Sequence, residues 1–208
     1  MFYATSTKLP LPFDPLKALV APRPIGWIST LSAKGELNLA PYSFFQAIAQ
    51  RPAMVIFSGE GAKDSISFAQ ESGEFVCNMA TFEFKDQMLR SSDDLPRGEN
   101  EFVHAGLETE SSGTVKPPRV KGIAAALECK VVTSFELKDL DGADIGRIAV
   151  IGQVTGVYID DRFIKEGKVD TAAMRLVARL GYFDYAVIDE VFQMRDRSIR
   201  TRPSLVKS

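Results

Sequence analysis

Hydroxyl and amide side chains interrupt an otherwise apolar stretch between residues 21 and 45. Apolar residues suffice to build a hydrophobic core, so polar side chains at these positions need another explanation. The polar residues in question are Ser29, Thr30, Asn38 and Ser43. Such side chains donate and accept hydrogen bonds without carrying charge. The stretch therefore predicts a surface that binds a small polar ligand lying against a sheet.

A second polar group follows an apolar run at residues 54–58 and reads Ser58-Gly59-Glu60-Gly61-Ala62-Lys63-Asp64-Ser65. Its spacing does not match the Walker phosphate loop, and the third glycine of the dinucleotide-binding fingerprint is missing. A glycine loop, a lysine and a helix start nevertheless present a cation, hydroxyls and free N–H groups to one anion. The segment indicates either an anion site or an ordinary strand-to-helix turn.

Residues suited to nucleophilic or metal-dependent catalysis are scarce. His104 is the single histidine, and no Gly-x-Ser-x-Gly elbow accompanies it. Cys77 and Cys129 lie in apolar runs and lack the number and spacing of a disulfide framework or a zinc site. The acidic pairs at 93–94 and 160–161 fit turns better than a catalytic carboxylate pair. We therefore expect no catalytic side chain and no metal site.

The elements that would position these residues are mostly strands. Runs rich in β-branched and aromatic residues predict strands at residues 25–31, 37–43, 54–58, 74–79, 123–137 and 147–159. Helical patterns occupy residues 64–72, 82–89 and 171–180. Asp64 or Ser65 can cap the first of these helices, and Gly73 fits its end. Many strands in hairpin order favour a mainly β fold with flanking helices, an antiparallel barrel rather than a doubly wound sheet.

We predict a single domain over residues 1–208, because this length suits one well-packed core and no repeat divides the chain. A polar, turn-rich segment at 91–116 is expected to be a surface excursion. A polar tail is expected from about residue 194 to residue 208. Its basic residues are interpreted as a solvated end rather than a binding arm: Arg195, Arg197, Arg200, Arg202 and Lys207.

Charge and hydropathy argue against two classes of partner. The chain has 25 basic and 27 acidic residues, a net charge of −2, which is unlike a broad nucleic-acid surface. No apolar run approaches the roughly 20 residues that cross a bilayer. The N-terminus lacks the basic start and apolar stretch of a secretory signal. We expect a cytoplasmic protein with no membrane or nucleic-acid partner.

The polar motifs occur in a specific order along the chain. The order is Pro22-Arg23-Pro24-Ile25, Trp27-Ile28-Ser29-Thr30, Asn38-Leu39-Ala40-Pro41-Tyr42-Ser43-Phe44-Phe45, Lys63-Asp64-Ser65, Glu74-Phe75-Val76-Cys77-Asn78 and Ala126-Leu127-Glu128-Cys129. From about residue 22 to residue 185, the chain resembles the flavin reductase-like, FMN-binding split-barrel family. It is more similar to the flavoredoxin-like branch than to nitroreductases or flavodoxins.

This resemblance implies an antiparallel split β-barrel with flanking helices, forming a homodimer with one FMN per subunit near the interface. It places the ribityl-phosphate at Ser29 and Thr30 and the flavin ring along residues 38–43. A carboxylate repels a phosphate, so Asp64 is expected to cap its helix while Lys63 and Ser65 meet the anion. The cofactor-binding residues implied are Arg23, Ser29, Thr30, Asn38, Ala40, Pro41, Tyr42, Ser43, Phe44, Ser58, Lys63, Asp64 and Ser65.

Several residues keep two interpretations. Arg23 either pairs with a surface carboxylate or lies near the flavin or its phosphate. Trp27 is expected in the core rather than stacked on the flavin. Phe44 and Phe45 alternate across a strand, so at most one faces the cofactor. Two roles remain, packing within the fold or contact with the ligand, for Asn78, Tyr182 and Tyr185.

A flavin would explain why nucleophiles and general bases are missing, because hydride transfer to flavin needs stacking, alignment and hydrogen bonds instead. The main hypothesis is an FMN-binding, flavin reductase-like oxidoreductase that uses NADH or NADPH. A second hypothesis is an FMN-binding electron carrier served by a redox protein partner. A third is an FMN-binding module without a redox role. No nicotinamide fingerprint separates the first two.

Overall fold

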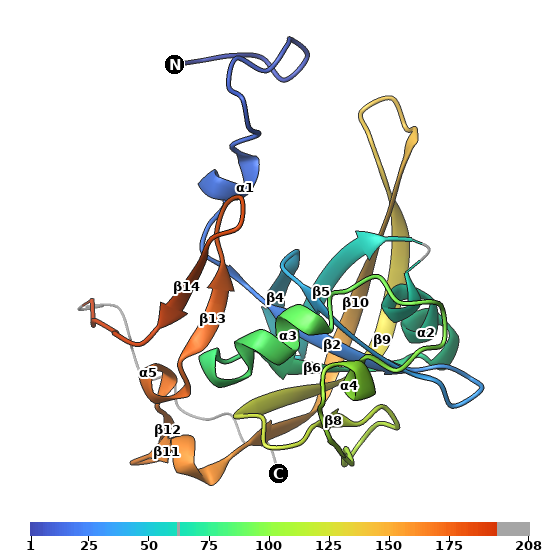
Figure 1. The fold of residues 1–208 in the computed structure, drawn as a ribbon, viewed down its shortest axis with the longest axis vertical. Coiled ribbons are helices and arrows are strands. Elements are labelled where there is room, and N and C mark those ends of the chain that lie inside the picture. The colour runs from blue at the N-terminus through green and yellow to red at the C-terminus, as the bar shows by residue number, and fades with distance from the viewer. Residues whose placement is uncertain (62, 195–208) are drawn as a thin grey trace.

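An antiparallel sheet of seven strands forms the centre of the protein in a computed structural model, which describes residues 1–61 and 63–194 (Figure 1). In sheet order, the strands are β3 (Leu37–Tyr42), β2 (Gly26–Leu31), β6 (Glu74–Met79), β9 (Ala125–Lys138), β10 (Asp144–Ile159), β5 (Ala53–Glu60) and β4 (Phe45–Gln50). The mainly β, antiparallel prediction is confirmed.

The sheet curves so that its two ends approach each other. The chain passes directly from β3 into β4, and the Ser58 N–H donates to the Phe44 carbonyl at 2.9 Å. The Tyr42 ring lies so close to Gly59 that a Cβ added there would stand 2.6 Å from Tyr42 Cε1. Strands β3 and β5 thus meet through side-chain contact without forming a ladder. This is a barrel that is split between β3 and β5.

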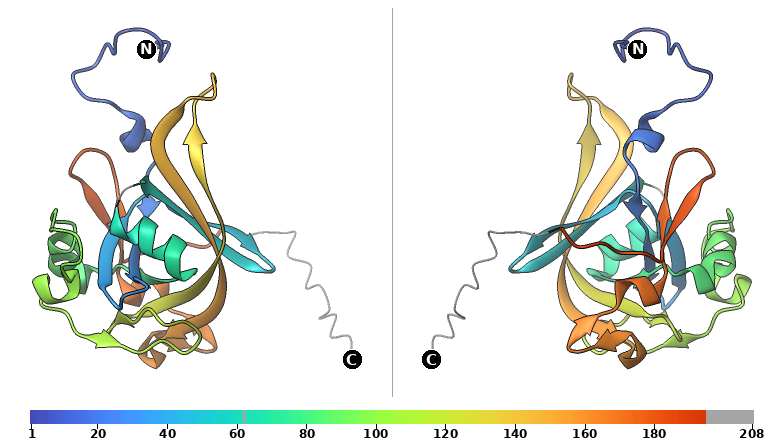
Figure 2. Two further views of the ribbon diagram at one scale, coloured as in Figure 1. Left: turned by 90° about the vertical axis from the view of Figure 1, so that its right-hand side faces the viewer. Right: turned by 90° about the vertical axis from the view of Figure 1, so that its left-hand side faces the viewer.

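Helix α2 (Asp64–Ser72) lies on the concave side of this sheet, where it contacts β2, β3, β6, β9 and β10 (Figure 2). The helix has the predicted boundaries. Ile66 and Ala69 are buried on one face, and Gly73 ends the helix in a left-handed conformation with φ 70°. The N-cap prediction is wrong: Lys63 is the N-cap, and no side chain caps the helix.

Short elements surround the barrel. The remaining strands are β1 (Arg23–Pro24), β13 (Leu176–Arg179) and β14 (Tyr185–Ile188) in one sheet, and the pairs β7 (Thr109–Glu110) with β8 (Arg119–Val120) and β11 (Ile164–Lys165) with β12 (Lys168–Val169). The remaining helices are α1 (Leu16–Leu19), α3 (Lys85–Arg90), α4 (Glu101–His104) and α5 (Thr171–Met174), with 3₁₀ turns at Phe82–Phe84 and Asp161–Phe163.

The helix expected at 171–180 is wrong in its second half. Helix α5 ends at Met174, and Arg175 takes a left-handed conformation with φ 50°. The next residues form β13, which pairs with both β1 and β14. Local periodicity did not reveal these partners, because they lie far away along the chain or beyond a turn.

Two hydrophobic clusters pack on opposite faces of the sheet. Trp27 belongs to one cluster and Ile28 to the other, because successive strand residues point to opposite faces. Trp27 is fully buried, as expected, and its indole N–H donates to Ser91 Oγ at 2.8 Å. Cys77 and Cys129 are buried free thiols in the second cluster.

The segment 91–116 contributes to the core as well as to the surface. Phe102 is buried in the same cluster as Trp27, and α4 packs against β3. The basic tail predicted at 195–208 lies outside the described residues. No helix within the described residues is long and apolar enough to cross a membrane.

Candidate functional site

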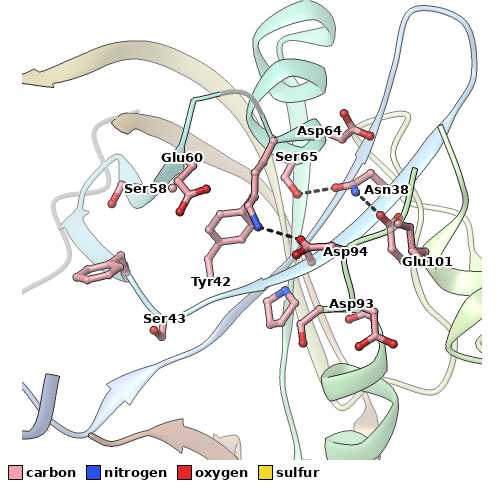
Figure 3. A pocket seen from close by; sticks show the side chains of 18 of the residues that line it. Asn38, Tyr42, Ser43, Ser58, Glu60, Asp64, Ser65, Asp93, Asp94 and Glu101 are labelled. Carbon is pink, nitrogen blue, oxygen red and sulfur yellow. Dashed lines mark hydrogen bonds and ion pairs between the residues drawn. The ribbon is translucent and has the colours of Figure 1, made fainter. Parts of the chain in front are cut away.

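A cavity of about 480 Å³ opens between the end of β3, the strand β5, the start of α2 and the segment 91–97 (Figure 3). Much of its wall consists of residues predicted from sequence: Asn38, Ala40, Pro41, Tyr42, Ser43, Phe44, Ser58, Lys63, Asp64 and Ser65. The structure therefore brings together the two polar groups of the sequence, one from β3 and one from the β5–α2 connection.

Strand alternation selects which β3 side chains face α2 and the cavity. Asn38, Ala40 and Tyr42 pair with Thr30, Ile28 and Gly26 of β2, so all of them point to the same face of the sheet. β3 is also an edge strand. Its outward N–H at Leu39 binds a carboxylate, and Pro41, two residues later, has no N–H to leave unpaired.

A chain of buried hydrogen bonds crosses the base of the cavity. The Ser65 hydroxyl donates to Asn38 Oδ1 at 2.5 Å, and Asn38 Nδ2 donates to Glu101 Oε1 at 2.8 Å. The Leu39 backbone N–H donates to Glu101 Oε2 at 3.1 Å. Figure 3 shows the bonds that join Ser65, Asn38 and Glu101 as dashed lines. All three side chains are buried. Burial raises the pKa of Glu101, although these hydrogen bonds oppose the shift.

Ion pairs tie the segment 91–98 to the start of α2. Lys63 Nζ lies 3.6 Å from Asp94, and Arg97 Nε lies 3.4 Å from Asp64. The Gly98 N–H also donates to Asp64 at 3.5 Å. Asp64 was expected to cap the helix, but its carboxylate serves as an anchor for this segment instead.

Two buried hydroxyls on the α2 face lack a hydrogen-bond partner among the described residues. They are the phenol of Tyr42, which lines the cavity, and Thr30 Oγ1, beside Asn38 in the β2–β3 register. Burial raises the pKa of Tyr42 to about 12, so the phenol keeps its proton at neutral pH. An unpartnered buried hydroxyl is costly, and a polar ligand would offset that cost.

Ser29 is not brought to the cavity. Its side chain points to the opposite face of β2 from Thr30, where its hydroxyl donates to the Pro118 carbonyl at 2.6 Å. Asn78 Nδ2 donates to Ser29 Oγ and to the Trp27 carbonyl, and Asn78 Oδ1 accepts from the Val120 N–H. Ser29 and Asn78 therefore hold strands and a loop together, and their polarity serves the fold.

Arg23 is buried away from this cavity, with its guanidinium on the carbonyls of Lys17, Val20 and Leu180. It joins the α1 region to the residue after β13, and among the described residues it pairs with no carboxylate. One of its acceptors, the Lys17 carbonyl, belongs to a residue that lines the cavity. Arg23 lines a second cavity of about 620 Å³ beside the first. The two cavities share Ser43, Phe44 and Ser58.

Phe44 and Phe45 lie in different environments, as strand alternation predicts. Phe44 is 43% exposed and lines both cavities, whereas Phe45 is buried in the core against Gly26. Tyr182 and Tyr185 are exposed beside β13 and β14, and neither lines the first cavity.

Other charged residues of the wall were missed from sequence: Lys17, Glu60, Asp93, Asp94, Arg97, Glu101 and Arg147. Asp93 to Glu101 belong to the segment interpreted as a surface excursion. One local signal was available, because Asn100 is a good N-cap residue and does accept from the Phe102 N–H at 2.9 Å. That signal predicts a short helix at Glu101 but gives no hint that this helix packs on β3.

Comparison with known proteins assigns the family. Residues 19–184 match the family described as flavin reductase like domain. The chain belongs to the flavin reductase-like family. An uncharacterized protein from Aquifex aeolicus is 34% identical over 169 residues, which cover 78% of this chain and 83% of that protein.

Solved structures show the same fold for this flavin reductase-like chain. Nitrilotriacetate monooxygenase component B from Bacillus cereus aligns with a TM-score of 0.80 at 24% identity, over 90% of this chain and 100% of that one. Flavoredoxin from Desulfovibrio vulgaris (Miyazaki F) aligns with a TM-score of 0.76 at 16% identity, over 96% and 99% of the two chains. The fold is the split barrel of flavin reductases.

Proposed function

We propose that this protein binds FMN in the cavity between β3 and α2 and acts as an oxidoreductase with NADH or NADPH as the electron donor. One observation carries the proposal: in a chain of the flavin reductase-like family, the polar face of β3 and the lysine at the start of α2 line one cavity. Neither group alone distinguishes a ligand site from ordinary structure.

The residues of the cavity fit FMN. Its volume of about 480 Å³ lies within the range of small-molecule sites. Lys63 and the first N–H groups of the nine-residue helix α2 offer positive charge to a phosphate at one end. The acidic neighbours Asp94 and Asp64 are paired with Lys63 and Arg97. The free phenol of Tyr42 supplies a donor along the wall.

Bound FMN would supply the hydride-accepting chemistry, and the chain would bind, orient and shield it. The wall of β3, from Asn38 to Ser43, would hold the ring, while Phe44 and the second cavity would leave one side open to a second substrate. No described side chain is required as a nucleophile or general base. The described wall of the cavity contains no histidine, and both cysteines are buried in the core.

We also propose a homodimer. The β9–β10 hairpin extends beyond the rest of the sheet (Figure 2). It carries exposed apolar side chains, namely Val132, Phe135, Leu140 and Ile145. Exposed apolar groups gathered on one projecting element favour association with another surface. The family resemblance supports a second copy of the chain as the partner surface.

Anaerobic titration of the purified protein with NADH, NADPH and dithionite, followed by visible absorbance, tests the function. We expect a yellow protein that NADH or NADPH bleaches. A colourless protein with no affinity for FMN would reject the proposal. Bound flavin that dithionite bleaches, without steady-state NAD(P)H oxidation, would instead favour an electron carrier served by a redox protein. Flavin that resists every donor would favour a non-redox module.

A further inference from the structure

The hydrogen bonds at the base of the cavity have a defined direction. Both oxygens of Glu101 accept hydrogen bonds, from Asn38 Nδ2 and from the Leu39 N–H, so the atom of Asn38 that faces Glu101 is the amide nitrogen. Asn38 Oδ1 then faces Ser65 and takes the hydroxyl proton of Ser65, at 2.5 Å. Ser65 lines the cavity and has one proton, which is already donated. It is left with lone pairs for a ligand and for the neighbouring Tyr42 phenol.

We propose that Glu101 is a positioning residue, which fixes the amide of Asn38 and so turns the proton of Ser65 away from a phosphate in the cavity. The inference rests on the proposed function. Its consequence is selectivity: Lys63 and the N–H groups of α2 must hold the phosphate without a hydrogen bond from Ser65. Glu101 thereby limits how strongly the site prefers FMN over riboflavin, which lacks the phosphate.

Burial makes this arrangement rigid. All three side chains of this series are buried. The Ser65 hydroxyl is engaged as donor to Asn38, and the Asn38 amide is engaged as donor to Glu101. Among the described residues, no lysine or arginine forms an ion pair with Glu101. Its second oxygen accepts from the Leu39 backbone N–H, a donor that cannot reverse. The Leu39 N–H therefore fixes the direction of every hydrogen bond in the series from Glu101 through Asn38 to Ser65.

Because the Leu39 N–H can only donate, the substitution Glu101→Gln is expected to reverse the hydrogen bonds of Asn38. The side-chain carbonyl of the introduced glutamine must face the Leu39 N–H, so its amide nitrogen faces Asn38. Asn38 then turns over, donates to Ser65 Oγ, and releases the Ser65 proton to the cavity. We expect FMN to bind about tenfold more tightly, as for one hydrogen bond to a charged group. Riboflavin affinity should change less than about twofold.

A double-mutant cycle separates this effect from the loss of a negative charge. Ser65→Ala alone should change the FMN Kd less than about threefold, because Ser65 has no proton to offer. Glu101→Gln should give no tightening when combined with Ser65→Ala. Glu99→Gln is the charge control, since Glu99 lies two residues from Glu101, is exposed and does not line the cavity. It should leave the FMN-to-riboflavin ratio near the wild-type value.

Two results of the cycle would overturn the inference. Tightening that persists without the Ser65 hydroxyl would be a charge effect. A tenfold loss in Ser65→Ala alone would mean that Ser65 already donates to the phosphate. A wild-type protein that binds no flavin would reject the proposed function and this role together, whereas normal FMN binding without coupling rejects the role alone.

An NMR measurement on the ligand-free wild-type protein tests the geometry even if a variant fails to fold. The side-chain amide protons of Asn38 should show nuclear Overhauser contacts to the Glu101 side chain and not to the Ser65 Hβ protons. In Glu101→Gln, the Ser65 contacts should appear. Ser65 contacts already present in the wild-type protein would contradict the proposal.

Discussion

Lys63 is the residue whose charge bears most directly on the proposed phosphate. Its side chain is half exposed and, among the described residues, pairs only with a fully exposed carboxylate, Asp94. Such a surface pair contributes little, so a phosphate can replace Asp94 at small cost. The anion would also meet the N-terminal end of α2, where a negative charge is favourable.

We therefore predict that Lys63→Ala weakens FMN binding by roughly 10-fold or more, the scale of one hydrogen bond to a charged group. Riboflavin binding should change little. Fluorescence titration with both flavins measures the effect, and Lys85→Ala, which removes a lysine outside the cavity, is the matched control. An equal loss for both flavins would place the phosphate elsewhere.

At the scale of the elements, strand β9 anchors the loop that contains Gly113 and Thr114. Glu128 of β9 is buried and accepts from the Gly113 N–H and from the N–H and hydroxyl of Thr114. Burial alone would raise the pKa of Glu128, but these hydrogen bonds and the nearby Arg119 lower it below its ordinary value. The carboxylate thus stabilises the fold in its charged form.

We predict that Glu128→Gln lowers the free energy of unfolding by about 1–2 kcal/mol at neutral pH, because the amide presents a donor to donors. A lowered folded-state pKa gives stability that is complete above the unfolded pKa of about 4.3 and is lost as pH falls through the folded value. The difference from wild type should therefore shrink below about pH 4. Urea unfolding measures it, with the exposed Glu136→Gln on the same strand as control. A difference that is constant with pH would assign the effect to packing.

The reactivity of the two buried thiols, Cys77 and Cys129, shows whether the core of the sheet stays closed to solvent. Burial raises the pKa of Cys77 well above the ordinary value and that of Cys129 to about 12. We predict that neither reacts with a thiol reagent at about pH 8 in the folded protein, because thiolate is the reactive form. Both should react after denaturation, and absorbance of the released chromophore counts them. Rapid reaction of the folded protein would show that this side of the sheet opens.

At the scale of the whole molecule, the β9–β10 hairpin projects from the barrel (Figure 1) and exposes Val132, Phe135, Leu140 and Ile145. We predict a solution mass of about twice the 22.9 kDa chain mass. Phe135→Glu should shift the protein toward monomer, because it places a charge in the proposed interface. Sedimentation velocity measures both masses, with Lys34→Glu in the exposed turn between β2 and β3 as a control for added negative charge. A wild-type monomer would reject the proposed dimer.

Local patterns accounted for much of the fold. Alternation and β-branched residues predicted six of the seven central strands and missed β4 (Phe45–Gln50), and helix α2 begins and ends where its periodicity indicates. The same alternation rule separates Phe44 from Phe45, and it also separates Ser29 from Thr30. Ser29 and Thr30 are predicted at one end of the ligand, but the Ser29 side chain points to the other face of β2, toward the Pro118 carbonyl.

The sequence by itself determined the family, the barrel strands other than β4, and the polar wall of β3, because these depend on the order and spacing of neighbouring residues. Only the tertiary structure decided that Glu101 meets Asn38 and that Arg23 binds backbone carbonyls. It also decided that residues 175–180 contribute a strand. These contacts join segments far apart in sequence, so their formation depends on how the whole sheet curves and packs, and no local periodicity records it.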